Sequence, residues 1–177
     1  DAGAKPAWQR FVRDLRAPLF AELGFDPRAG AYVGEDPERT VRRTTVIESL
    51  ALTGHDPAIR ATLSAAAARR IAGDQAALDP MWDLTAFTVH VEEGGLPAAR
   101  ALIEQGLAST DERFRQAALL APAASGRPEV ARWLLDELTD KRLRVTEKRY
   151  MLGSIIGEKD TAEYGYQWLK DHLGELT

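Results

Sequence analysis

Apolar residues recur along most of the chain at the spacing of an α-helix. Phe11, Leu15, Leu19 and Leu23, for example, repeat every four residues. This spacing places apolar side chains on one helical face, where they can pack into a core. The segment 85–91 is rich in strand-forming residues, but its apolar positions keep the helical spacing, so we expect a helix there as well. The pattern therefore predicts an all-α protein.

Asp-Pro pairs indicate where several of these helices begin. They occur at 36–37, 56–57 and 79–80, each time before a run with helical spacing. Aspartate accepts hydrogen bonds from the first free N–H groups of a helix, and proline at the first position has no N–H to satisfy. Asp160 with Glu163 predicts a capping box at a further start. Breaks near 24–34, 54–55, 73–77, 94–95, 109–110, 125–127, 140–144 and 157–159 leave about nine helices, joined by short connections as antiparallel hairpins.

The helix openings recur along the chain. They lie near Pro57, Pro97, Pro128 and Thr161, at intervals of 40, 31 and 33 residues. Two-helix repeats of this length are typical of α-solenoids such as HEAT and tetratricopeptide arrays, whose neighbouring hairpins bury a shared core. We therefore predict an α-solenoid of about four to five antiparallel helical hairpins, a HEAT/armadillo-like superhelix, as a single domain over residues 1–177. The alternative is a non-repetitive helical bundle.

Composition narrows the classes of function. The 177 residues are 45% hydrophobic and 28% charged, and the net charge is −4. Phosphate binding needs clustered Lys and Arg, so we expect no nucleic-acid partner. The absence of cysteine excludes disulfides, thiolate metal sites and cysteine catalysis. No apolar run approaches the ~20 residues of a membrane span, so we expect no membrane partner and a cytoplasmic location.

The histidines and the serine between two glycines match no catalytic motif. His55, His90 and His172 are the three histidines, and no two have the spacing of His-Glu-x-x-His. The segment 153–157 lacks the spacing of the Gly-x-Ser-x-Gly nucleophile elbow. We therefore expect no metal site and no catalytic residue in this chain. The two glycines of this segment are interpreted as a place where helices approach closely.

Three arginines, Arg60, Arg100 and Arg132, recur at equivalent places in the repeats. A row of guanidinium groups can hold a carboxylate, so these arginines are candidates for facing a bound peptide. Alternatively, they form solvated salt bridges with acidic residues of neighbouring repeats. The acidic residues considered are Glu104, Asp136 and Glu137.

Aromatic residues on helical stripes are expected to be core or interface anchors. Those near the two ends of the chain, Trp8 at the start and Tyr166 with Trp168 at the end, are expected to cap the array or to dock it on a neighbouring domain. The full set comprises Trp8, Trp82, Trp133, Tyr164, Tyr166 and Trp168.

Four segments carry a family resemblance: 20–27 (FAELGFDP), 53–61 (TGHDPAIRA), 107–119 (LASTDERFRQAAL) and 166–173 (YQWLKDHL). Together they resemble the C-terminal domain of gluzincin zinc aminopeptidases, the type that includes aminopeptidase N and the puromycin-sensitive and endoplasmic-reticulum aminopeptidases. The last segment is similar to that domain's closing pattern, aromatic-x-aromatic-aliphatic-Lys-x-Asn-Trp. His172 and Leu173 stand in place of its Asn-Trp. The resemblance covers the chain from about Trp8 onward.

The resemblance implies a HEAT-like helical bowl that covers the catalytic domain and helps to form the chamber admitting short peptides. Its partners would be the catalytic domain of the same polypeptide and the peptide substrate. The family's Gly-Ala-Met-Glu-Asn motif, His-Glu-x-x-His and third Glu ligand are absent from the sequence, so no catalytic residue is carried over. No cofactor is implied in this chain, and zinc is implied in the full-length enzyme. Because the chain starts with Asp1, we expect a C-terminal fragment of a longer metallopeptidase, inert alone.

Two other functions stay open. A stand-alone HEAT-type scaffold would bind a partner protein or peptide in its concave groove. A HEAT-like DNA glycosylase would need a basic groove lined with aromatic residues and an acidic catalytic residue, which the net charge of −4 disfavours.

Overall fold

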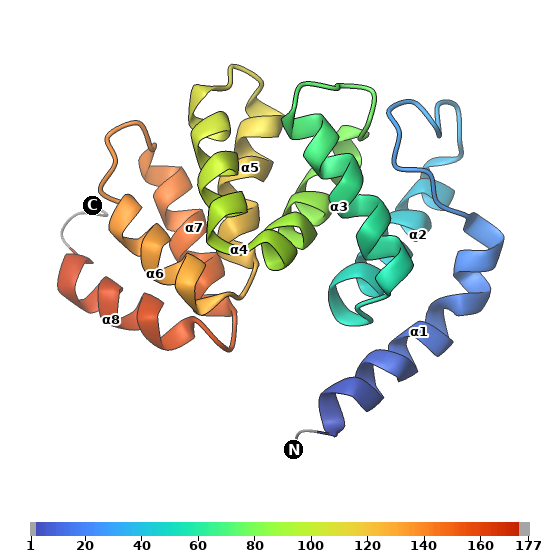
Figure 1. The fold of residues 1–177 in the computed structure, drawn as a ribbon, viewed down its shortest axis with the longest axis horizontal. Coiled ribbons are helices and arrows are strands. Elements are labelled where there is room, and N and C mark those ends of the chain that lie inside the picture. The colour runs from blue at the N-terminus through green and yellow to red at the C-terminus, as the bar shows by residue number, and fades with distance from the viewer. Residues whose placement is uncertain (1–2, 174–177) are drawn as a thin grey trace. The chain divides into compact units, whose positions relative to one another are not determined.

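The computed structural model describes residues 3–173 and is built from helices (Figure 1). Within that range there are eight α-helices and no strand, which confirms the prediction of an all-α protein. A π-helical turn, η1 (Ser49–Thr53), continues α2, and a short 3-10 helix, η2 (Pro80–Trp82), precedes α4. The α-helices are α1 (Ala4–Leu23), α2 (Pro37–Glu48), α3 (Pro57–Ile71), α4 (Asp83–Ala108), α5 (Glu112–Ala124), α6 (Pro128–Glu137), α7 (Val145–Gly157) and α8 (Ala162–His172).

Helix α4 consists of two helical stretches joined at Gly95. This residue has φ 61° and ψ −149°, a backbone conformation that only glycine adopts readily. The predicted break at 94–95 is therefore confirmed, and counting the two stretches separately gives the nine helices expected over the described residues. The segment 85–91 lies in the first stretch and is helical, as its apolar spacing predicts.

The three predicted Asp-Pro helix starts are confirmed. The Asp36 carboxylate accepts a hydrogen bond from a backbone N–H of the first turn of α2 at 2.7 Å. Asp56 accepts two such bonds at the start of α3, each 3.0 Å long. Asp79 accepts one at 3.1 Å at the start of η2.

The predicted capping box at Asp160 is wrong. Helix α8 begins one residue later than expected, after Thr161, and no side chain caps its first N–H groups. The Thr161 hydroxyl is buried and donates instead to the backbone carbonyl of Ile155 at 2.7 Å. The Thr161 side chain therefore joins the α7–α8 turn to α7 and does not cap α8.

Close helix packing occurs at glycines other than those predicted. A Cβ atom added at Gly153 or Gly157 would meet no atom within 4 Å, so the expectation for that segment is wrong. A Cβ at Gly106 would lie 2.9 Å from the Cβ of Ala118, and one at Gly165 would lie 2.6 Å from Ile156 Cγ1. These two glycines let α4 approach α5 and α8 approach α7.

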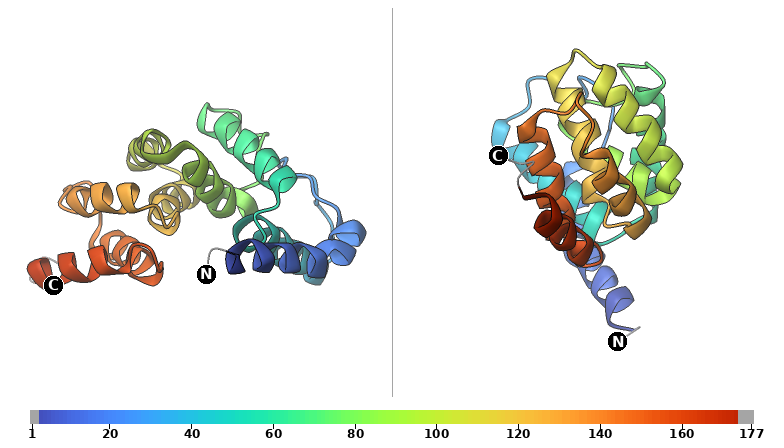
Figure 2. Two further views of the ribbon diagram at one scale, coloured as in Figure 1. Left: turned by 60° about the horizontal axis from the view of Figure 1, so that its bottom comes forward. Right: turned by 90° about the vertical axis from the view of Figure 1, so that its left-hand side faces the viewer.

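The chain divides into two compact units, Asp1–Val89 and His90–Thr177. In the first, α1 packs on α2 and η1, and α3 packs on η1. In the second, α5 packs on α7 and α6 on α8, which gives two layers (Figure 2). The largest buried side chains are Ile47, Leu63, Leu78, Trp82, Phe87 and Val89 in the first unit, and Val91, Leu102, Leu134, Leu138, Met151 and Ile155 in the second.

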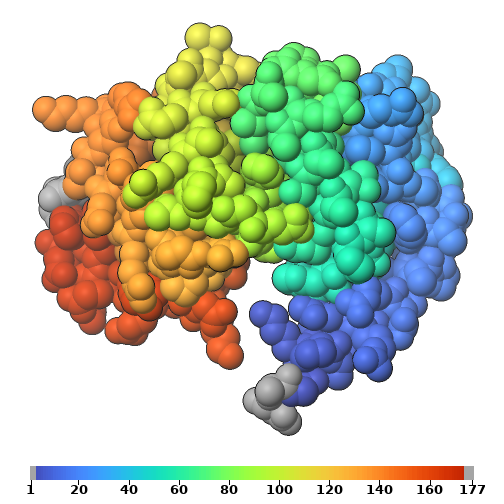
Figure 3. Space-filling model, in the orientation of Figure 1, coloured from blue at the N-terminus to red at the C-terminus, as the bar shows by residue number. Residues whose placement is uncertain are grey.

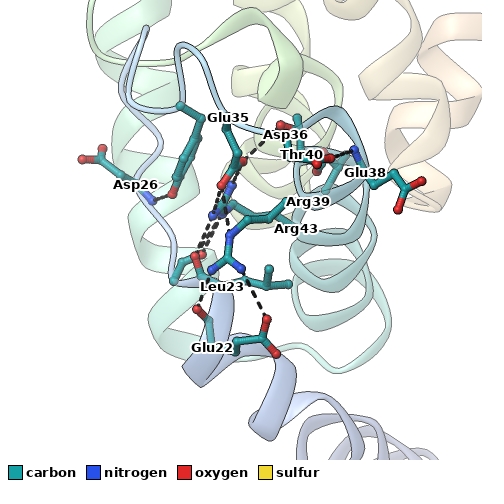
Figure 4. A network of polar contacts seen from close by, with 12 residues as sticks. Glu22, Leu23, Asp26, Glu35, Asp36, Glu38, Arg39, Thr40 and Arg43 are labelled. Atoms are coloured by element: carbon teal, nitrogen blue, oxygen red, sulfur yellow. Dashed lines mark hydrogen bonds and ion pairs between the residues drawn. The ribbon is translucent and has the colours of Figure 1, made fainter.

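A buried arginine, Arg43 of α2, organises the loop between α1 and α2 (Figure 4). Its guanidinium forms an ion pair with the Glu35 carboxylate and donates to the Leu23 carbonyl at 2.8 Å. It also lies over the ring of Tyr32, 3.7 Å from the centroid. Hydrogen bonding to Arg43 holds the pKa of Glu35 below its ordinary value. Arg43 therefore joins the end of α1, the loop and α2.

Replacing Arg43 with alanine should remove the donor for both the Glu35 carboxylate and the Leu23 carbonyl. We expect the free energy of unfolding to fall by about 3 kcal/mol, because partly buried polar groups lose their partner. Denaturant unfolding followed by circular dichroism measures the change. The control is Arg42→Ala in the same helix, whose 67% exposed side chain should contribute less than about 0.5 kcal/mol. Equal losses in both variants would contradict the role given to Arg43.

Candidate functional site

The candidate site is a pocket between α5 and α7 in the second unit, with a volume of about 410 Å³. Leu119 and Met151 are buried and contribute to its lining, and Tyr150, 67% exposed, lies at its edge. Tyr150 and the partly exposed Leu120 offer the apolar surface that a ligand can reach from solvent, with Leu119 and Met151 beneath it. The other lining residues are Gln116, Arg144, Thr146 and Glu147.

Glu147 has three roles at this pocket. It lies in the first turn of α7, where its carboxylate accepts the backbone N–H of Arg144 at 2.8 Å. It also receives two hydrogen bonds from the guanidinium of Arg115 on α5, at 2.6 and 3.0 Å. Finally, it contributes to the pocket lining. The Glu147 carboxylate therefore helps to hold α5 against α7 and also forms part of one wall of the pocket.

Arg115 is buried and binds more than this carboxylate. Its guanidinium donates to the Leu107 carbonyl at 3.1 Å and to the Arg142 carbonyl at 3.0 Å. It therefore connects the end of α4, the loop before α7, and α7 itself. The sequence around Arg115 does not reveal this burial, because its partners Arg142 and Glu147 are distant along the chain.

The charges around the pocket are paired. Arg144 forms two hydrogen bonds with Glu112, at 2.8 and 2.7 Å, while Arg115 is paired with Glu147. Burial tends to raise the pKa of Glu147, but the hydrogen bonds from Arg115 and the Arg144 N–H outweigh it, so the pKa is lowered. Hydrogen bonding to Arg144 likewise lowers the pKa of Glu112. Two cations and two carboxylates therefore compensate one another, which suits an uncharged ligand group.

The predicted peptide-facing arginines lie elsewhere. Arg60, in the first unit, is largely buried and donates to the Ala51 carbonyl at 3.0 Å. Arg100 lies over the ring of Trp133, 5.6 Å from its centroid, and Arg132 over Tyr164 at 4.4 Å. In the second unit these contacts connect α4 to α6 and α6 to α8, the helices outside the α5–α7 layer. That these arginines face a peptide stays a prediction.

For Arg100 and Arg132, the alternative salt bridges with these acidic residues do not occur among residues 3–173. Glu104 pairs instead with Arg142, at 2.9 Å. Glu137 accepts a hydrogen bond from Trp133 Nε1 at 3.0 Å. Arg100 therefore contacts the aromatic ring of Trp133 on α6, and Arg132 contacts that of Tyr164 on α8, rather than the carboxylates of those helices.

The three histidines are placed separately. His55 lies in the turn before α3 with φ 47°, His90 is half-buried in α4, and His172 stacks on Trp168 with ring centroids 4.4 Å apart. Burial lowers the pKa of both His55 and His90. Over the part of the chain that the structure describes, no three His, Asp or Glu residues form a cluster that could hold a metal ion. No helix within that part is long and apolar enough to cross a bilayer.

The aromatic residues divide between core and surface. Trp82 is completely buried and makes an edge-to-face contact with Phe25, with ring centroids 5.2 Å apart. Trp8 and Tyr166 are more than half exposed. The expectation of a core anchor is confirmed for Trp82, while docking by Trp8 and Tyr166 stays a prediction.

The lowered pKa values of Glu147 and Glu112 predict acid sensitivity. Their ionised forms stabilise the folded state above the ordinary value of 4.5, and this contribution is lost as the pH falls through the folded pKa. Melting temperatures between neutral pH and about pH 3 should show a shallower acid loss for Glu147→Gln, which starts less stable at neutral pH. Glu163→Gln, an exposed control on α8, should follow the wild type. A wild-type acid slope in Glu147→Gln would refute this assignment.

Comparison with known proteins bears on the whole chain. No curated protein matches the sequence. Among protein families, the ERAP1-like C-terminal domain matches residues 1–177. This match agrees with the resemblance of the four segments that include the α1–α2 loop and the start of α5. The chain therefore belongs to the family of ERAP1-like C-terminal domains.

Proposed function

We propose that this chain is the helical domain of a zinc-dependent aminopeptidase, where it covers the catalytic domain and shapes the chamber through which peptides enter. The family match over residues 1–177 carries the proposal. The chain would supply no catalytic residue and no zinc ligand, and the zinc would belong to the catalytic domain of the same polypeptide. A cytoplasmic location is part of the proposal.

The packing within the second unit supports a chamber-forming role. Helix α5 lies on α7 and α6 on α8, as expected where one antiparallel hairpin stacks on the next. We propose that this stacking extends through the family's fold as a HEAT-like superhelix. Stacked helical hairpins form a continuous surface, and such a surface can enclose one side of a chamber.

The α5–α7 pocket supports contact with a peptide. Its apolar lining and paired charges suit a neutral side chain or peptide backbone better than a charged group. Its volume of about 410 Å³ falls within the range of small-molecule sites. The peptide would be contacted by this wall while the chemistry takes place on the catalytic domain.

The chain alone should be inert. We expect residues 1–177 to show no hydrolysis of aminoacyl-anilides with added zinc, and to retain no stoichiometric zinc after dialysis, as measured by atomic absorption. The matched positive control is a complete zinc aminopeptidase under the same conditions. Zinc-dependent hydrolysis by the chain alone would overturn the proposal.

Joined to a catalytic domain of this type, the chain should change the preference for peptide length. We expect Tyr150→Ala to lower kcat/KM for longer peptides by about fivefold, because an apolar contact is lost, and to leave aminoacyl-anilide hydrolysis unchanged. Val41→Ala is the control, since this apolar side chain is similarly exposed, at 64%, but lies on α2, outside the pocket. The same length profile with and without the chain would contradict the chamber role.

A further inference from the structure

The α5–α7 pocket contains three uncharged polar side chains whose hydrogen-bonding groups are unused. Gln116, Thr146 and Tyr150 line the pocket, and within residues 3–173 their side chains form no hydrogen bond. The charged lining residues, Arg144 and Glu147, each have a partner of opposite charge. The groups that stay available to a ligand are therefore an amide and two hydroxyls rather than a charge.

An apolar surface lies beside these polar groups. Leu119 and Met151 are buried, Leu120 is partly exposed, and methionine adapts its shape to an apolar partner. None of the lining residues belongs to α4, α6 or α8, the helices that form most of the second unit's face in Figure 3. The volume of about 410 Å³ is near the lower end of the range for ligand pockets, so the occupant is a small group such as one residue.

We propose that the pocket binds one apolar residue from the interior of a peptide, with the Gln116 amide bound to the main chain of that residue. This inference rests on the proposed function and names the part of the peptide that the pocket contacts. In an extended peptide, the N–H and C=O of one residue point to the same side. A glutamine amide has both a donor and an acceptor, so it can bind both groups. The hydroxyls of Thr146 and Tyr150 can bind the next peptide groups.

The paired charges disfavour either end of a peptide. A terminal carboxylate would meet the carboxylate of Glu147 and would compete with Glu112 for Arg144, which donates two hydrogen bonds to Glu112, at 2.8 and 2.7 Å. A terminal ammonium would meet the Arg144 guanidinium. An interior residue carries neither charge, but its amide groups lose water on binding and need partners. The free amide of Gln116 supplies them.

Binding of capped tripeptides to residues 1–177 tests the proposal, with the isotope-labelled chain observed by NMR. We expect acetyl-Ala-Leu-Ala-amide to shift the side-chain amide signals of Gln116. Methylation of the leucine nitrogen removes one hydrogen-bond donor and should weaken binding by about fivefold. A peptide with glutamate in place of leucine, or one that ends at leucine with a free carboxylate, should bind more weakly by at least about fivefold, because a charge enters the pocket.

The variant Gln116→Leu identifies the group that binds the main chain. Without the amide, the parent and methylated peptides should bind equally well, because the lost hydrogen bond is the one that methylation removes. Gln105→Leu is the matched control, since this glutamine is also exposed but lies on α4, outside the pocket. It should keep the fivefold difference of the wild type. Circular dichroism confirms that both variants are folded.

Three results would overturn the proposal. The leucine peptide could leave the signals of the pocket residues unchanged, or the peptide that ends in a carboxylate could bind more tightly than the capped one. The difference between parent and methylated peptides could also survive in Gln116→Leu. These measurements need no catalytic domain, so an unchanged preference for peptide length in the joined enzyme, with capped peptides bound as described, would remove the chamber role alone.

Discussion

The fold depends on arginines that bind the carbonyl groups left free where a helix ends. These carbonyls have no partner within their own helix and carry the negative end of its dipole. Arg43 binds them for α1, Arg60 for η1, Arg115 for α4, and Arg127 for the stretch of α4 that ends before Gly95. Helices α1, α2 and α4 have no basic residue in their last turns, so the cation comes from a later helix.

This device suits a chain of short helices joined by short connections. Each of these helix ends lies against a later helix or its first residue, so an arginine there can bind the free carbonyl and hold the two elements at a fixed angle. Arg43 and Arg115 also hold a carboxylate, which offsets the cost of burying the guanidinium, and the more exposed Arg127 pairs with Glu129. The same arginine contacts therefore give the free carbonyl groups a hydrogen-bond partner and help to orient the helices that they join.

The sequence predicted what is encoded locally. Aspartate caps, proline starts and the glycine break at Gly95 act through their own backbone, so their positions follow from neighbouring residues. It did not predict which arginine is buried, or that Gly106 and Gly165 rather than Gly153 allow close packing. Those properties depend on residues that are distant along the chain. The α5–α7 pocket was missed for the same reason, because neither helix shows it alone.

Arg100 and Arg132 show that recurrence of a residue at equivalent places in the repeats does not by itself establish the function of that residue. Their repeated position follows from the repeated packing of one helix on the next, where each guanidinium lies on an aromatic ring. The structure thus gives the recurrence a packing explanation that needs no ligand. Glu147 raises the opposite difficulty, since it caps α7, binds Arg115 and lines the pocket. A change there alters fold and pocket together, so only pocket residues outside this network, such as Tyr150, can separate peptide contact from stability.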